Sequence, residues 1–443
     1  MTALARTPLL VFMLGSLTAF APMSIDMYLP ALPDLQKSLL TDPAHLQLTL
    51  ASFFAAFAIG QLFYGPLADR FGRKPPLYFG IGLFAITSLA CMWVTTVETL
   101  IALRFVQALG ACAGVVIARA VVRDSFEGAE ASRMYAAMML VMGVAPMVAP
   151  MLGGQLLVWF GWHSIFGMLA LYGGLVLWLL HKKLPETLAV ADRQPLHLGL
   201  SLRAYGSLLA SHQFRGFALT SSVSMAGLYA FIAASPFVFM VYFGLNAQQF
   251  GLLFGANAFC LIMATQVNSR ILDIWSPRTV LQRSLLLQMF AGSCFGLLAY
   301  TGWGGFWALI APLAIYTACL GFVLPNATIL ALEPFKLQAG TASALYGTIG
   351  SVSGAIAASV VSALQGHNAA VLGMVIAVCG IVACLRRRFL PRGIKQSTRV
   401  TELGESFGYF TAGLNGGSPR FQAISIAAMI DFKVISARNG LAG

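Results

Sequence analysis

Twelve apolar stretches follow one another along the 443-residue chain. Each is long enough for a helix that crosses a bilayer, which needs roughly 20 mostly apolar residues. Helices fit better than the strands of a membrane barrel, because the stretches are continuous and lack alternation in segments of roughly ten residues. The expected spans are residues 8–29, 47–68, 77–96, 99–122, 133–158, 162–181, 214–242, 247–268, 279–300, 303–331, 339–363 and 368–385.

The composition supports lipid as the solvent of this chain. Hydrophobic residues make up 58% of it and charged residues only 9%, whereas a soluble domain averages about 25% charged residues. So few charges cannot cover the chain with a polar surface. We therefore expect an all-α integral membrane protein with 12 transmembrane helices.

Lysine and arginine gather in alternate connections between the expected spans, and the opposite connections hold only Lys37. Cytoplasmic loops collect these residues, so both termini are expected in the cytoplasm. The net charge of +12 comes from separate short loops, and we therefore expect no nucleic-acid binding. The basic residues are Arg70, Arg73, Lys74, Arg123, Arg133, Lys182, Lys183, Arg193, Arg203, Arg215, Arg270, Arg278, Arg283, Lys336, Arg386, Arg387 and Arg388.

The N-terminus allows two interpretations. Arg6, an apolar run and "AFA" at 19–21 are typical of a secretory signal with its cleavage site. We favour a first helix that is retained in the mature protein. Enzyme motifs are missing from the sequence: it has no P-loop, no nucleophile elbow and no metal-ligand cluster among its seven cysteines and six histidines. We expect neither an enzyme nor a metal site.

A polar connector at 182–213 divides the chain into two parts with six expected spans each. The predicted domains are an N-terminal half at 1–181, a C-terminal half at 214–388 and a tail at 389–443, to which we assign no function. Two six-helix halves related by a pseudo-two-fold axis along the membrane normal, with the substrate between them, are a transporter architecture.

The connection "GPLADRFGRKPP" after the second span is the most specific motif. Glycine permits tight turns and close approach of helices. Asp69 can pair with Arg73 or with the positive end of a helix. The alternative is an ordinary basic loop that contains glycine by chance. The motif residues are Gly65, Asp69, Arg70, Gly72, Arg73 and Lys74.

This motif is similar to the G-x(3)-D-R-x-G-R-K signature of the major facilitator superfamily. "RFVQALGACAG" at 104–114 resembles the Arg-x-x-Gln-Gly motif of drug/proton antiporters, with Ala108 where Gly is common. "DMYLPALP", "ASPFVF" and "LPNATILAL" resemble the Bcr/CflA multidrug-exporter branch. "APMVAPMLGG" resembles the helix 5 motif of exporters, and Ala145 stands at a common Gly. The matching helix 5 residues are Pro146, Pro150, Gly153 and Gly154.

The resemblance implies a specific function and location. It implies proton-coupled efflux of small amphipathic drugs across the bacterial inner membrane by alternating access, and hence antibiotic resistance. The proton gradient would supply the energy without a cofactor, and the protein would be a monomer. The alternatives are an importer or uniporter of a small metabolite on the same fold, or a membrane sensor or channel. The sequence contains no loop that resembles a selectivity filter, which argues against a channel.

Asp26 is a carboxylate near the outer end of the first span, about 10 Å below that end at ~1.5 Å per residue. Arg104 on the fourth span lies at a similar depth, roughly 8 Å below the same surface. An unpaired charge at the bilayer centre costs about 2.5–3.5 kcal/mol or more. We therefore expect Asp26 to face the interior near Arg104, Gln107 or water. The pair either holds two helices together or couples transport to protons, and many antiporters carry a second acid where this chain has Thr18.

A drug site needs an apolar cavity with few polar groups. Each aromatic candidate could instead face the lipid or fill the protein core without contacting a substrate. The predicted substrate-contact residues are Asp26, Phe53, Phe57, Gln107, Tyr229, Phe237, Asn257 and Asn326. The motif around Asp69 is predicted to be a gate, whose partners are Arg73 and the start of helix 11 at 339–345 when the cytoplasmic side is closed.

Overall fold

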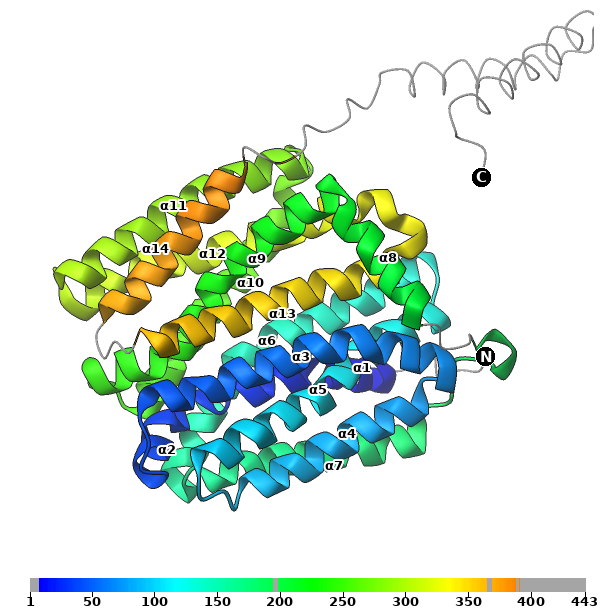
Figure 1. The fold of residues 1–443 in the computed structure, drawn as a ribbon, viewed down its shortest axis with the longest axis horizontal. Coiled ribbons are helices and arrows are strands. Elements are labelled where there is room, and N and C mark those ends of the chain that lie inside the picture. Colours follow the sequence, from blue (N-terminus) through cyan, green and yellow to red (C-terminus); the bar gives the residue numbers. More distant parts are fainter. Residues whose placement is uncertain (1–7, 194–197, 365–368, 388–389, 391–443) are drawn as a thin grey trace, which may run out of the picture. The chain divides into compact units, whose positions relative to one another are not determined.

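Long helices follow the apolar stretches in the computed structural model, which describes residues 8–193, 198–364, 369–387 and 390 (Figure 1). The first six are α1 (Pro8–Asp26), α3 (Pro43–Phe71), α4 (Lys74–Cys91), α5 (Val97–Ser125), α6 (Gly128–Phe160) and α7 (His163–Lys183). The second six are α9 (His212–Ser235), α10 (Ala247–Ile271), α11 (Pro277–Thr301), α12 (Gly305–Leu332), α13 (Ala339–Ala363) and α14 (Ala369–Arg386). The described residues include no strand.

Short helical elements complete the described chain. They are η2 (Leu29–Ala31), α2 (Leu32–Ser38), η3 (Val190–Asp192), α8 (Leu198–Ala210), η4 (Pro236–Tyr242) and η5 (Glu333–Gln338). By length and composition, 11 helices of the described ranges can cross a membrane. The expected span at 77–96 corresponds to helix α4, which is not one of these 11 helices. Its mean hydropathy is too low because it begins with Lys74 and two prolines.

Polar side chains outside the apolar stretches cap the first turn of several of these helices. The Asp42 side chain accepts from the backbone N–H of His45 and caps α3. Asn246 and Gln249 form a capping box at α10. Each such side chain satisfies a backbone group that the first turn of a helix leaves unpaired. Several of the helices therefore start at polar caps, and some extend beyond the apolar stretch that predicts them.

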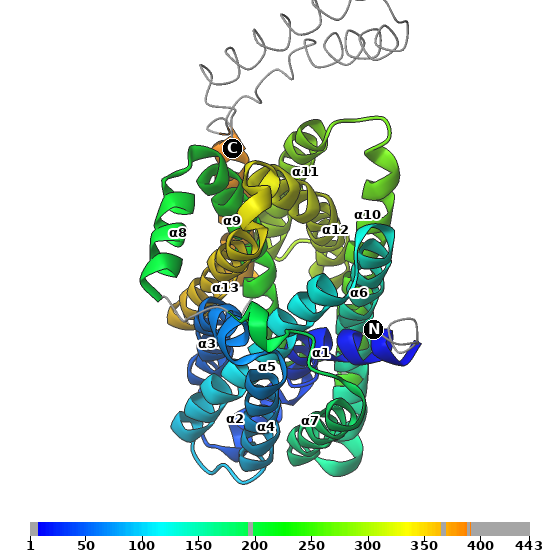
Figure 2. The same cartoon turned by 90° about the vertical axis from the view of Figure 1, so that its right-hand side faces the viewer.

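Helix α6 packs against both halves through the glycines of the helix 5 motif. A Cβ added at Gly153 would meet the carbonyl oxygen of Met27, at the end of α1. One added at Gly154 would lie 2.9 Å from the carbonyl oxygen of Ala247, at the start of α10. Figure 2 shows α6 and α10 side by side. The motif thus provides close helix approach, and Pro146 and Pro150 lie inside the same helix.

Helices α3 and α13 form the second contact between the halves (Figure 1). Gln61 of α3 donates to the hydroxyl of Ser351 at 2.9 Å. Near the other end of α3, Ser362 of α13 donates to the carbonyl oxygen of Ala44 at 2.9 Å. The first six and the second six long helices therefore meet along α3–α13 and α6–α10.

The connector at 182–213 contains a helix that was not expected from its polarity. Tyr205 and Leu208 of α8 are buried, and the Tyr205 hydroxyl donates to the carbonyl oxygen of Leu62 at 3.4 Å. Leu390 apart, the tail predicted at 389–443 lies outside the described residues. The predicted boundaries of the two halves, at 1–181 and 214–388, and of the tail remain predictions.

We expect Gly153→Ala to destabilise the bundle, because its Cβ has no room beside Met27. Overpacking of this kind costs about 1–3 kcal/mol. The apparent melting temperature of the detergent-solubilised protein should fall by several degrees. Gly174→Ala in α7 is the matched control, since nothing lies within 4 Å of its Cβ position, and alanine favours a helix by up to ~1 kcal/mol. Equal melting temperatures for the two variants would contradict the close approach.

Candidate functional site

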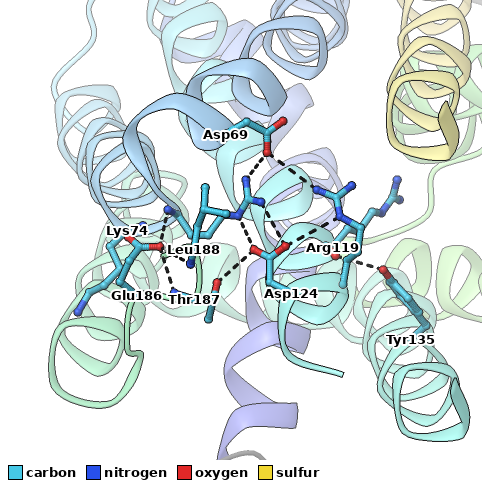
Figure 3. A network of polar contacts seen from close by, with 10 residues as sticks. Asp69, Lys74, Arg119, Asp124, Tyr135, Glu186, Thr187 and Leu188 are labelled. Atoms are coloured by element: carbon cyan, nitrogen blue, oxygen red, sulfur yellow. Dashed lines mark hydrogen bonds and ion pairs between the residues drawn. The ribbon is translucent and has the colours of Figure 1, made fainter. Parts of the chain in front are cut away.

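Arg73 lies at the centre of a polar network at the end of the bundle where α3 ends and α4 begins, here called the basic end (Figure 3). Its Nη1 donates to Asp69 at 2.6 Å. Its Nε and Nη2 donate to the two carboxylate oxygens of Asp124, at 2.6 and 3.2 Å. Arg73 is only 2% exposed, so two carboxylates neutralise a buried cation and join α3 to the end of α5.

Glu186 continues this network from the connector. Its carboxylate accepts from the backbone N–H groups of Arg73, at 2.8 Å, and Lys74, at 3.0 Å. It therefore neutralises the positive end of α4. Gly72 makes this possible, because its φ is +91° and a Cβ there would lie 2.7 Å from Glu186 Oε2. The other two backbone donors are Thr187 and Leu188.

The charge of Glu186 is favoured by these bonds. Burial raises the pKa of the Glu186 carboxyl group, but the backbone N–H donors lower it by more, so the net shift is downward. Neither Glu186 nor Asp124 was identified from the sequence. The available signals were "LPETL" directly after α7 and Arg-Asp at the end of α5. Neither pattern indicates that its acidic residue bonds to Arg73.

Asp69 pairs with Arg73, as expected, but Arg123 is the residue that reaches the other half. Arg123 Nη2 lies 4.0 Å from Asp69 Oδ1. A Cβ added at Gly340, near the start of α13, would lie 2.9 Å from Arg123 Nη1. In the described residues, Arg123 therefore lies between Asp69 and the start of α13, and the predicted direct contact of Asp69 with residues 339–345 is not seen.

The remaining motif residues have simpler surroundings. Arg70 is exposed. A Cβ at Gly65 would meet nothing within 4 Å, so packing does not require glycine there. Lys74 lies over the ring of Tyr78, with Nζ 5.6 Å from its centroid. The tight turn and the close approach of the motif are both concentrated at Gly72.

Asp26 ends α1 and is 4% exposed, so it faces the protein interior as expected. Within the described residues it has no hydrogen bond or ion pair. Tyr229 of α9, in the other half, lies close enough to interact with it electrostatically. The Tyr229 ring also packs on Phe54, with centroids 4.5 Å apart. A carboxyl group without a partner thus lies beside a tyrosine of the opposite half.

Arg104 is fully buried, but the described residues show no contact between it and Asp26. Its guanidinium carbon lies 4.7 Å from the Tyr28 ring centroid and 4.5 Å from that of Phe53. Its Nη1 donates to Gln107 at 2.6 Å. The expected neighbourhood of Arg104 and Asp26 is therefore corrected. Two aromatic faces hold the cation, and such contacts are worth ~2 kcal/mol or more when desolvated.

Two predicted drug contacts instead support Arg104. Gln107 accepts from Arg104 and donates to Ser88 at 2.6 Å, so both ends of its amide are occupied. Phe53 is fully buried beneath the guanidinium. The structure gives both residues a packing role in this conformation. Phe57, which stacks on Phe53, is only partly buried.

The predicted contacts in the second half are separated from one another. Asn326 is buried and donates to Asn268 at 2.7 Å, which links α12 to α10. Asn257 of α10 is 6% exposed, and neither atom of its amide has a partner within the described ranges. Phe237 is buried in η4. Of the predicted substrate contacts, the structure brings Asp26 and Tyr229 together, and within the described ranges it leaves the buried amide of Asn257 without a hydrogen bond.

Sequence comparison relates the chain to membrane transporters. The Major Facilitator Superfamily model matches residues 14–358. An uncharacterized MFS-type transporter of Bacillus subtilis, YdgK, is 37% identical over 85% of this chain and 94% of its own length. A bicyclomycin resistance protein homolog of Haemophilus influenzae is 34% identical over 87% and 96%. Multidrug resistance protein D of Escherichia coli is 28% identical over 85% and 94%.

Solved structures of the same fold include transporters of several substrates. A D-xylose-proton symporter matches with a TM-score of 0.69 and 14% identity, over 86% of this chain and 98% of that one. The nucleoside transporter NupG matches with a TM-score of 0.69 and 14% identity, over 86% and 100%. At such identities the likeness shows the fold alone.

We expect Glu186→Gln to lower stability in a pH-dependent way. The pKa of Glu186 is lower in the folded protein than its ordinary value of about 4.3. Its stabilising contribution is therefore full above that value and is lost as the pH falls through the folded pKa. The melting temperature of the variant should lie a few degrees below that of the wild type at pH 7, and the two should converge once the pH has fallen below the folded pKa of Glu186. A difference that persists unchanged at low pH would show that the charge of Glu186 has no role.

Proposed function

Because the chain belongs to the major facilitator superfamily, we propose that it exports small amphipathic compounds in exchange for protons. Its relatives include a bicyclomycin resistance protein homolog and multidrug resistance proteins, as expected of a Bcr/CflA-type drug exporter. The observation that carries proton coupling is Asp26, a buried carboxyl group that has no hydrogen-bond or ion-pair partner among the described residues and lies beside Tyr229 of the other half. The protein is proposed to lie in the bacterial inner membrane with both termini in the cytoplasm.

Proton exchange at Asp26 follows from relative movement of the halves. A carboxyl group holds its proton more tightly when it is shielded from water. Asp26 lies where α1 ends, and Tyr229 belongs to α9, so separation of the two halves would admit water or a substrate to the carboxyl group. A bound drug and a proton would then compete for the same site. The proton gradient supplies the energy, and no cofactor is required.

Arg104 acts in this proposal by positioning rather than by pairing. Its cation stays between Tyr28 and Phe53, and Tyr28 follows Asp26 by two residues. Tyr28 also shares a hydrogen bond of 3.0 Å with Thr49 of α3. The chain after Asp26 is thereby anchored to the N-terminal half, and the carboxyl group is left facing the other half.

Import of a metabolite on the same fold is the alternative. The structural neighbours include a symporter, so the fold does not decide the direction of transport. Purified protein in liposomes with an imposed pH gradient would decide it. Drug movement against the proton flux supports export, and movement with the flux supports import.

We expect Asp26→Asn to abolish proton-coupled transport, because the amide cannot exchange a proton. In proteoliposomes, addition of a transported drug should release protons from the wild-type protein and not from the variant. Asp34→Asn is the matched control, since Asp34 is exposed on α2 and should behave like the wild type. Undiminished drug-stimulated proton release by Asp26→Asn would contradict the coupling role.

We expect Asp69→Asn to weaken closure of the cytoplasmic side, because Arg123 loses the carboxylate 4.0 Å away. An exposed ion pair contributes ~0–1 kcal/mol, so the populations should shift by up to about fivefold. Cysteines at Phe71 and Gly340, with the native cysteines replaced, would report closure through a flexible bifunctional cross-linker. Cross-linking and turnover should both fall. Equal cross-linking together with a large loss of drug affinity would place Asp69 in the binding site instead.

A further inference from the structure

Arg119 is a membrane-embedded arginine that the proposed mechanism does not use. It lies on α5, six residues before the helix ends at Ser125, and therefore about 9 Å inside that end. Its guanidinium makes no hydrogen bond or ion pair within the described part of the chain. Its nitrogens are not among the buried atoms that lack a partner, and the residue is only partly buried. The cation is therefore accessible inside the bundle.

The acids of the basic end are already paired with other arginines. Asp69 and Asp124 accept from Arg73 and lie 4.0 Å from Arg123. In Figure 3 the Arg119 guanidinium points away from these carboxylates. The ionisable side chains close enough to interact with Arg119 are Tyr135 and Cys112, and neither is negatively charged at neutral pH. No carboxylate of the described residues neutralises this cation.

The position of Arg119 faces the boundary between the halves. Side chains four residues apart share one face of a helix, and one turn separates them by roughly 6 Å. Arg123, one turn nearer the basic end, lies against Gly340 near the start of α13. Arg119 therefore lies on the face that approaches α13, one turn deeper in the bundle. Transporters of this architecture bind substrates at the boundary between their halves.

Tyr135 fixes the backbone at this point. Its hydroxyl donates to the carbonyl oxygen of Arg119 at 3.1 Å, which joins α6 to α5 (Figure 3). The tyrosine bonds to the backbone and leaves the guanidinium without a partner. Ionisable side chains inside a membrane-spanning bundle are rare and mark sites for substrates or ions. Arg119 is such a side chain, and it lies on the face between the halves.

We propose that Arg119 binds the negatively charged head group of amphipathic substrates. A guanidinium offers a planar pair of N–H donors that matches carboxylate, sulfonate or phosphate oxygens. Arg119 follows Arg104 by 15 residues of α5, which is about 22 Å along the axis. Asp26 lies near the opposite end of the bundle, so the two groups do not hold one small molecule together. Arg119 therefore receives the anionic head group nearer the basic end, away from the Asp26 carboxyl group.

The inference rests on the proposed export function and deepens its substrate class. The test uses two fluorescent probes that differ in one group: 1-anilinonaphthalene-8-sulfonate and N-phenyl-1-naphthylamine, which lacks the sulfonate. Binding is measured by fluorescence in phosphatidylcholine nanodiscs, with empty nanodiscs subtracted, so that anionic lipid does not compete. The variants are Arg119→Gln, which removes the charge, and Arg119→Lys, which keeps it without the planar donor pair. Arg203→Gln is the control, since Arg203 is exposed on α8.

We expect Arg119→Gln to weaken binding of the sulfonate probe by about tenfold or more, as loss of a charge-assisted hydrogen bond implies. Arg119→Lys should recover part of that affinity. Binding of the neutral probe should change less than twofold in every variant, which also shows that the variants are folded.

Two results would overturn the inference. One is equal affinity of Arg119→Gln and the wild type for the sulfonate probe, and the other is absence of sulfonate binding by the wild type. Transport is measured separately in proteoliposomes with an imposed pH gradient. If the wild type expels neither probe, the export function fails, whereas the binding comparison still decides the role of Arg119.

Discussion

The cost of a charge in a membrane interior governs the polar chemistry of this bundle. An isolated ion in lipid costs several kcal/mol, so each buried charge needs a local means of stabilisation. Arg73 is stabilised by two carboxylates and Arg104 by two aromatic rings. Asp26 has neither, and a carboxyl group can avoid the cost by taking a proton. The same constraint is the physical reason why our proposal assigns proton exchange to Asp26.

The close contacts between the halves have a different physical origin. Gly153 and Gly154 let α6 touch α1 and α10 at backbone distance, where van der Waals contact replaces the hydrophobic effect that lipid removes. The contact between α3 and α13 is partly polar, through Gln61 and Ser351. The boundary between the halves therefore combines small-residue contacts with a few hydrogen bonds.

The sequence predicts the helices well because hydropathy acts locally, whereas the site depends on residues distant in the chain. The motif around Asp69 identified Arg73 as a partner, since the two are four residues apart on adjoining elements. It could not identify Asp124 or Glu186, which lie 51 and 113 residues from Arg73. For Arg104, equal depth suggested Asp26 as a neighbour. Depth in the membrane does not specify the direction in which a side chain points. The Arg104 side chain points toward the rings of Tyr28 and Phe53.

The arginines of α5 show how one helix can serve several purposes. Arg104 is caged by rings, Arg119 has no acidic partner, and Arg123 lies beside Asp69 and Gly340. Their order along the helix runs from one end of the bundle to the other. Under our proposal, Arg119 binds an anion nearer the basic end, whereas the rings of Tyr28 and Phe53 already occupy the faces of Arg104. The three guanidinium groups carry the same charge, so the difference between them comes from their surroundings.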